Sequence, residues 1–287
     1  MLIMEKQQRI TEFQKGNLIF DVIDSGPIDG TPIVLLHGFP ETSKIWQHSA
    51  EILNQHGFRT YALNQRGYSL RAQPKKRADY AIQHLADDVN VLLDLIGEPS
   101  YIVGHDWGAV VAWEVALRYP NKIKHLTAIS VPHKAAIMRA FYSSTQLFKS
   151  YYMGLFQLPW IPELLFNKTP QIGEALLKNS GMTVEQLNNF KQEMIIEKRL
   201  SPSLNWYRGL PFSSNKTLFN KVKVPTLFIW GKDDVAIDAK GVQFNQNYVE
   251  GPYTEIHLEA NHWIPVQNYH ELTDLILKEQ QKIIIKK

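Results

Sequence analysis

The sequence contains no cysteine among its 287 residues. This absence excludes disulfide bonds, thiolate nucleophiles and cysteine-ligated metal sites. No run approaches the roughly 18 consecutive apolar residues that a membrane-spanning helix needs. The opening residues Met1–Lys6 hold a short apolar stretch that is broken by an acid and lacks a cleavage-site pattern, so we expect no secretory signal. We therefore expect a cytoplasmic protein that has no membrane partner.

The excess of one sign of charge is also small, because 31 Lys and Arg residues against 28 Asp and Glu residues leave a formal net charge of +3. The local basic clusters Lys75–Arg77 and Lys282–Lys287 are typical of solvated surface. No basic stripe with interleaved aromatic residues is present, so we expect no nucleic-acid partner. The hydrophobic content of 44% instead indicates a globular chain with a full core.

Short apolar segments and helix-like segments alternate along most of the chain. This order is typical of βαβ units around a parallel sheet, so we predict an α/β fold class with a mostly parallel sheet flanked by helices. Buried strands are expected at residues 18–23, 33–36, 58–63, 100–103, 126–131, 226–230 and 254–258. Helices are expected at residues 46–55, 80–96 and 109–117 and from about residue 270.

One block departs from this alternation. Residues 133–215 are aromatic, punctuated by proline and helix-like, and they contain no clear sheet strand. A helical block placed within an α/β order indicates an inserted lid. We therefore expect a core formed by residues 1–132 and 216–287, with a helical cap at residues 133–215.

An aspartate occupies the centre of the segment Gly104-His105-Asp106-Trp107-Gly108. The frame G-x-S-x-G marks a sharp strand-to-helix turn that exposes a nucleophile, and here Asp106 replaces the serine. A carboxylate nucleophile suits attack on a carbon that carries a leaving oxygen or halide, and the resulting ester must then be hydrolysed. The motif favours ring opening or dehalogenation over peptidase chemistry. Taken alone, it also fits an ordinary surface turn.

Such a nucleophile needs oxyanion donors, a base for the water and an acid that orients the base. In folds of this strand order the acid follows the nucleophile and the histidine comes last. Asp233 and Asp234 both follow a predicted strand, and His262 follows the final one. The backbone N–H groups of Phe39 and Trp107 are the expected oxyanion donors.

Two other histidines lie near the elbow, but the positions of His37 and His105 fit scaffolding of the loops better than base chemistry. The early loop His37-Gly38-Phe39-Pro40-Glu41 also contains a proline. The sequence leaves open whether the peptide bond before Pro40 is cis.

Three of these segments together resemble the epoxide hydrolases of the α/β-hydrolase fold, in particular the soluble enzymes. They are the loop from His37 to Glu41, the elbow continued to Ala109, and Asn261-His262-Trp263. The resemblance covers nearly the entire chain, and it favours Asp234 over Asp233 as the acid.

The same resemblance implies two tyrosines in the cap that donate hydrogen bonds to the epoxide oxygen. Tyr152, in Ser150–Pro159, and Tyr207, in Leu204–Arg208, take the matching places. A neutral phenol can donate to the alkoxide that forms when the ring opens, and can then transfer a proton. The implied reaction converts a small apolar epoxide and water to a vicinal diol and requires no metal or organic cofactor.

Two alternatives remain at this point. A haloalkane or haloacid dehalogenase shares the fold and the Asp nucleophile, although Phe39, Trp107 and Val110 do not match its usual halide or carboxylate ligands. A non-catalytic binding protein of the same fold is the other alternative, although no triad member is missing. The segment Asn64–Arg71 departs from the pattern of the resembled family, which puts substrate preference in doubt more than the mechanism. The sequence leaves open whether the protein is a monomer or a homodimer.

Overall fold

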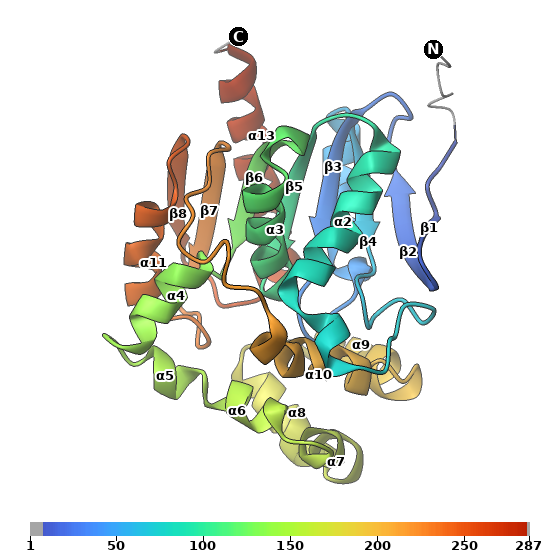
Figure 1. Ribbon diagram of the computed structural model, residues 1–287, viewed down its shortest axis with the longest axis vertical. Helices are drawn as coiled ribbons and strands as arrows, with labels where there is room; N and C mark the ends of the chain where they lie inside the picture. The colour runs from blue at the N-terminus through green and yellow to red at the C-terminus, as the bar shows by residue number, and fades with distance from the viewer. Residues whose placement is uncertain (1–7, 286–287) are drawn as a thin grey trace.

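The computed structural model describes residues 8–285 (Figure 1). The expectations about Met1–Lys6 and about the basic end at Lys286 and Lys287 lie outside these residues. An eight-stranded sheet runs through the molecule in the order β1-β2-β4-β3-β5-β6-β7-β8. Strands β1 and β2 pair antiparallel, as do β2 and β4, and all other pairs are parallel. The predicted α/β class with a mostly parallel sheet is confirmed.

The strands match the apolar segments of the sequence closely. They are β1 (Glu12–Lys15), β2 (Leu18–Ser25), β3 (Thr31–Leu36), β4 (Phe58–Leu63), β5 (Ser100–His105), β6 (Ile123–Ile129), β7 (Thr226–Gly231) and β8 (Tyr253–Leu258). The short edge strand β1 was not predicted, because its four residues carry no apolar run. The predicted end of β6 at residue 131 is wrong, since Ser130 adopts a positive φ of 68° and ends the strand.

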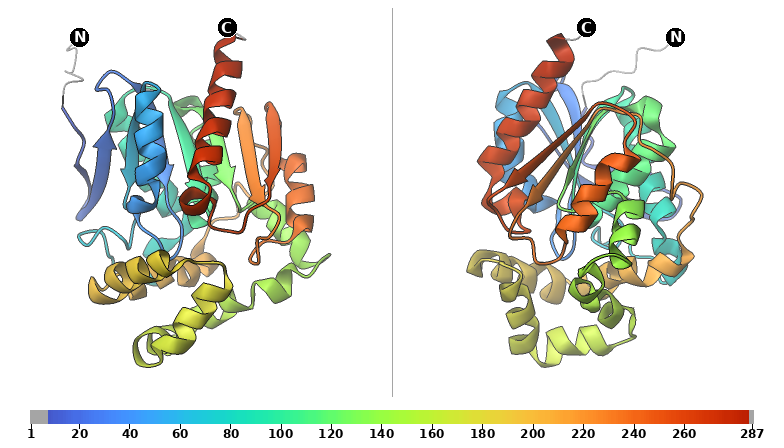
Figure 2. Two further views of the ribbon diagram at one scale, coloured as in Figure 1. Left: turned by 180° about the vertical axis from the view of Figure 1, so that it is seen from behind. Right: turned by 90° about the vertical axis from the view of Figure 1, so that its left-hand side faces the viewer.

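Both faces of the sheet are buried under helices (Figures 1 and 2). Strand β3 illustrates why its sequence is continuously apolar: Ile33 and Leu35 belong to the core on one face, and Val34 and Leu36 to the core on the other. A parallel strand covered on both sides reads as such a run. On one face lie α1 (Gln47–Gln55) and α13 (Tyr269–Ile285), and on the other α2 (Ile82–Ile96) and α3 (Trp107–Arg118).

Helix α2 shows how the apolar spacing builds this packing. Leu85, Val89, Leu92 and Leu93 are all buried, as their helical spacing predicts. The helix ends at Gly97, which takes a positive φ of 77° that glycine adopts without strain.

The chain between β6 and β7 is helical and lies across the end of the sheet from which Asp106 emerges (Figures 1 and 2). Its elements are α4 (Lys134–Phe141), α5 (Gln146–Lys149), α6 (Tyr151–Gln157), α7 (Ile161–Lys168), α8 (Pro170–Asn179), α9 (Val184–Phe190), the short π-helix η4 (Lys191–Ile196), α10 (Leu200–Gly209) and η5 (Leu210–Phe212). Helix α11 (Ala239–Asn245) follows β7, and α12 (Ile264–Gln267) follows β8. Short 3-10 turns occur at η1 (Ser43–Trp46), η2 (Arg77–Tyr80), η3 (Pro120–Lys122) and η6 (Gln246–Tyr248). Within residues 8–285, no helix is both long and apolar enough to cross a membrane.

Candidate active site

Asp106 stands at a sharp turn between β5 and α3, with φ 52° and ψ −120°. The turn brings the helix so close to the sheet that two neighbouring positions have no room for a side chain. A Cβ on Gly108 would lie 2.1 Å from the carbonyl oxygen of Leu36, and one on Gly104 would lie 2.2 Å from the carbonyl oxygen of Gly108. The two glycines of the motif are therefore required by this close approach, and the strained backbone of Asp106 presents its carboxylate beyond the strand end.

Two backbone N–H groups donate to that carboxylate. The N–H of Phe39 donates to Oδ1 of Asp106 at 2.9 Å, and the N–H of Trp107, at the start of α3, also donates to this carboxyl group. The peptide bond between Phe39 and Pro40 is cis, which answers the question that the sequence left open. The two predicted oxyanion donors thus converge on the carboxyl group of Asp106.

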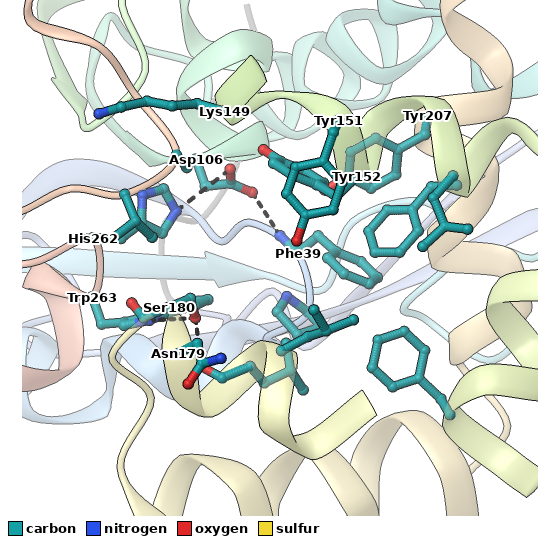
Figure 3. A pocket seen from close by; sticks show the side chains of 18 residues that line it. Phe39, Asp106, Lys149, Tyr151, Tyr152, Asn179, Ser180, Tyr207, His262 and Trp263 are labelled. Carbon is teal, nitrogen blue, oxygen red and sulfur yellow. Dashed lines mark hydrogen bonds and ion pairs between the residues drawn. The ribbon is translucent and has the colours of Figure 1, made fainter. Parts of the chain in front are cut away.

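His262 lies between the carboxylates of Asp234 and Asp106, and Figure 3 shows it beside Asp106. Its Nδ1 is 2.8 Å from Oδ2 of Asp234, and its Nε2 is 3.6 Å from Oδ2 of Asp106. Asp234 is buried, whereas Asp233 is exposed, so the structure brings Asp234 and not Asp233 to the histidine. The strand ends of β5, β7 and β8 therefore gather the three predicted side chains at one place.

The opposite charges in this cluster stabilise each other's ionised forms. Burial alone would lower the pKa of His262, but the negative charges of Asp234 and Asp106 outweigh it and raise the pKa to about 10. Burial alone would raise the pKa of Asp106, but the hydrogen bond and charge of His262 hold it below its ordinary value. At neutral pH the site therefore contains an ionised nucleophile beside a protonated histidine.

Two tyrosines from the inserted helices reach the same place. Tyr152 comes from α6 and Tyr207 from α10, and their ring centroids lie 6.2 Å apart at 80°. Burial raises the pKa of each phenol above its ordinary value of 10. Both groups are therefore neutral hydrogen-bond donors at any physiological pH. Tyr207 also packs edge-on against Trp107, with centroids 5.0 Å apart, which fixes its ring beside the elbow.

Two hollows meet at the nucleophile. One has a volume of about 320 Å³ and the other about 260 Å³. The first is bordered by His262 and Trp263 and is otherwise mainly apolar (Figure 3). Both hollows touch the same four residues, which are Asp106, Tyr152, Tyr207 and Ala236. A molecule bound at Asp106 can therefore extend in two directions. Over the described part of the chain, no cluster of three or more His, Asp or Glu side chains is arranged to hold a metal ion.

The two other histidines of the region are buried and bonded to backbone. His37 accepts from the N–H of Gln65 at 3.2 Å, and Nε2 of His105 pairs with the carbonyl of His262 at 2.8 Å. Burial lowers the pKa of each to about 4, so both are neutral at physiological pH. Their placement agrees with the scaffolding role predicted from the sequence.

Glu41 is a buried acid for which the sequence predicted no role. Its Oε1 accepts from Nε2 of Gln186 at 2.9 Å, whereas Oε2 has no partner among the described residues. Burial raises the pKa of Glu41 to about 7, and the group interacts electrostatically with His262 and Asp106. The acidic residue of the His37–Glu41 loop was visible in the sequence, but its burial was not.

The chain is similar to a known family and to known proteins, and the similarity to individual proteins covers nearly its whole length. A family model described as the alpha/beta hydrolase fold matches residues 31–177. Epoxide hydrolase 3 of Xenopus tropicalis is 33% identical over 286 residues, spanning 94% of this chain and 77% of that protein. The AB hydrolase superfamily protein YfhM of Bacillus subtilis is 32% identical over 273 residues, spanning 92% and 94%. The crystal structure of epoxide hydrolase VrEH1 from Vigna radiata superposes with a TM-score of 0.80 at 25% identity, covering 97% of this chain and 99% of that one.

Proposed function

This chain belongs to the epoxide hydrolases of the α/β-hydrolase family, and from that premise we propose that it opens epoxides through a covalent ester on Asp106. One observation carries the proposal. The ionised Asp106, His262 and the two neutral phenols of Tyr152 and Tyr207 all border one cavity, and Asp234 holds Nδ1 of His262. A nucleophile, a base and two acids for a leaving oxygen are the groups that ring opening and ester hydrolysis need.

In the first step, Oδ2 of Asp106 attacks an epoxide carbon while Oδ1 stays with its backbone donor. The carbon–oxygen bond of the ring breaks, and the ring oxygen becomes an alkoxide. Tyr152 and Tyr207 donate hydrogen bonds to this oxygen, and one of them transfers a proton to it. The product is a hydroxyalkyl ester of Asp106, and the phenol regains its proton from solvent.

In the second step, His262 acts as the base. Formation of the ester removes the charge of Asp106, one of the two carboxylates that raise the pKa of His262. The histidine then loses its proton and activates water, with Asp234 holding its Nδ1. Water attacks the ester carbonyl, and the N–H groups of Phe39 and Trp107 stabilise the resulting oxyanion. Collapse of this intermediate releases the diol and restores Asp106.

The substrate is a small epoxide with apolar substituents. Aromatic and aliphatic side chains line most of both hollows, and an epoxide held at Asp106 has room for a substituent on either side. Residues 133–215 serve as the cap, because they carry both phenols and close the cavity over the strand ends. Water is the second substrate, and no metal or organic cofactor takes part in this scheme.

A parallel assay of styrene oxide, a haloalkane and an activated ester tests the proposal. We expect turnover of the epoxide to the diol and its complete loss in Asp106→Ala. Release of halide without turnover of the epoxide would move the function to dehalogenation. Absence of turnover on all three substrates, in protein that is folded by circular dichroism, would favour a binding protein of this fold.

A further inference from the structure

The loop that carries Asp234 binds the carboxylate of that residue through its own backbone N–H groups. Oδ1 of Asp234 accepts from the N–H of Ala236 at 2.8 Å and from the N–H of Ile237 at 3.1 Å. This leaves Oδ2 for His262, at 2.8 Å. The direction of the Asp234 side chain therefore depends on the conformation of residues 234–238, which we call the acid loop.

The side-chain amide of Gln146 binds the outer edge of the acid loop. Its Nε2 donates to the carbonyl of Ala236 at 2.8 Å, and its Oε1 accepts from the N–H of Asp238 at 2.7 Å. The remaining amide hydrogen reaches Oγ of Ser150 at 2.9 Å. The Gln146 side chain is almost completely buried, with a relative exposure of 1%. Both donors and the acceptor of one buried amide are thus engaged, and two of the three bonds go to the acid loop.

Neighbours of Gln146 add further contacts to the same loop. Nζ of Lys149 lies 3.4 Å from the carbonyl of Asp234 and 3.3 Å from that of Ile237. Thr145 donates to the side chain of Asp238 at 2.6 Å. These residues belong to α5 and the turn before it, and the next helix, α6, carries Tyr152. One short segment, next to the helix of Tyr152, therefore contacts the acid loop at several points.

We propose that Gln146 is a positioning residue, which holds the acid loop so that Asp234 stays directed at His262. The inference rests on the proposed function of that pair in ester hydrolysis. The side chain of Gln146 also borders the second hollow. Among the described residues, Gln146 makes no hydrogen bond to Asp106 or His262, and its link to them runs through the acid loop. Its loss therefore slows hydrolysis of the ester more than formation of the ester, because formation uses Asp106 and the phenols.

The chain offers a matched control in Gln83, on α2. Its Nε2 donates to the carbonyl of Phe212 at 3.2 Å, and its Oε1 accepts from the N–H of Ser214 at 2.9 Å. The Gln83 amide therefore donates one hydrogen bond and accepts another from the backbone, as the Gln146 amide does, but near the other end of residues 133–215. Gln83 is half-buried and has no bond to the acid loop. If loss of a glutamine only loosens the inserted helices, both glutamine variants will show the effect. An effect through Asp234 will appear only in the Gln146 variant.

The test compares Gln146→Leu, Gln83→Leu and the unaltered protein in single turnovers with styrene oxide. Quenched samples analysed by mass spectrometry give the rates of ester formation and ester hydrolysis. We expect hydrolysis in Gln146→Leu to fall by about 10- to 100-fold, because small misplacement of a catalytic group has effects of this size. Ester formation should fall by less than about threefold, and Gln83→Leu should change both rates by less than about threefold.

A pH series separates positioning from mere destabilisation. His262 faces Asp106, Asp234, Glu41 and His105, and of these only Asp234 is held by Gln146. If Asp234 moves away, the pKa of His262 in the ester falls, so the midpoint of the hydrolysis rate moves to lower pH. A destabilised but correctly placed pair keeps the original midpoint.

Equal behaviour of the two glutamine variants, with an unmoved midpoint, would overturn the inference. If Gln146→Leu does not fold, Gln146→Glu replaces it, because the introduced carboxyl has the same length and keeps the acceptor for Asp238. The same selective loss of hydrolysis is expected there, and unchanged hydrolysis would also overturn the inference. Absence of any ester in the unaltered protein would refute the proposed function itself, an outcome distinct from either of these.

Discussion

The charge on Asp106 should control the pKa of His262, and this relation links the two chemical steps. In the resting protein His262 lies between two carboxylates and has a pKa of about 10. It is therefore protonated at neutral pH and cannot serve as a base. Esterification of Asp106 removes one of the two charges, so the pKa of His262 must fall when the base is needed.

The separation of the groups gives the size of this fall. Nε2 of His262 lies 3.6 Å from Oδ2 of Asp106. At an effective dielectric constant of about 20, an opposite charge at this distance contributes on the order of 5 kcal/mol. Its loss lowers the pKa of His262 by roughly three. The pKa of the histidine in the ester is then about 7, so a substantial neutral fraction exists at physiological pH.

Asp106→Asn provides a substitute for the ester, because the amide has a similar shape and no charge. Nuclear magnetic resonance of labelled histidine side chains measures the pKa of His262 in this variant and in the unaltered protein. His262→Gln identifies the resonance among the 10 histidines. Intact mass must show that the amide survives, since the site is built to hydrolyse a carbonyl at this position. Asp233→Asn, a change at the exposed neighbour of Asp234, is the control and should leave the pKa of His262 where it is.

The kinetic counterpart is a pH series of the two separate steps. Hydrolysis should rise with pH through a midpoint near the lowered pKa of His262, because the neutral form is the base. Ester formation, measured in Glu41→Gln so that Glu41 does not titrate in this range, should change little between about pH 6 and 9, since Asp106 is ionised and both phenols are protonated throughout. An unchanged pKa in Asp106→Asn, or a midpoint carried by ester formation instead, would refute this reasoning.

Three further predictions follow from single groups. Tyr152→Phe and Tyr207→Phe should each slow ester formation by up to about 10²-fold and together abolish it; full activity of the double variant in a diol assay would contradict the phenol assignment. Glu41 has a pKa of about 7 against 4.5 when unperturbed, so the folded state loses stability as pH rises between these values. Between pH 4.5 and 8, the free energy of unfolding of Glu41→Gln, measured in urea, should therefore rise by about 3 kcal/mol relative to that of the unaltered protein. The same dependence of the free energy of unfolding on pH in both proteins would refute this. Gly108→Ala should lower the free energy of unfolding by more than about 4 kcal/mol, because a Cβ there would lie 2.1 Å from a backbone oxygen. Gly154→Ala, where nothing lies within 4 Å of the added Cβ, should leave the free energy of unfolding unchanged or raise it.

The sequence predicted those parts of the protein that depend on local pattern. A parallel strand covered on both faces typically reads as an apolar run, so β3, β5 and β7 are recognisable. The glycines around Asp106 indicated a tight turn because only glycine tolerates such contact. The order of Asp106, the acid and His262 followed from the strand order of the sheet. The choice of Asp234 over Asp233 needed the resemblance, because both residues follow the same strand.

Features that depend on contacts distant in sequence could not be predicted. Burial of Glu41 arises where Gln186, 145 residues later in the chain, packs against it. The hydrogen bonds of Gln146 to Ala236 and Asp238 join segments about 90 residues apart. A single glutamine in the sequence does not indicate such bonds. The end of β6 was misjudged because Val131 continues the apolar run, whereas the positive φ of Ser130 interrupts the strand. Pattern identifies elements, and packing between them determines which polar groups meet.

Intact-protein mass spectrometry of His262→Gln after incubation with an epoxide tests the central claim most directly. The variant should form the ester on Asp106 and fail to hydrolyse it, so the protein gains the full mass of the epoxide. Peptide mapping should locate the gain on Asp106, and Asp106→Ala should show none. A His262→Gln protein that remains unmodified and still produces diol would mean direct attack by water, and the account of Asp106 as a covalent nucleophile would be wrong.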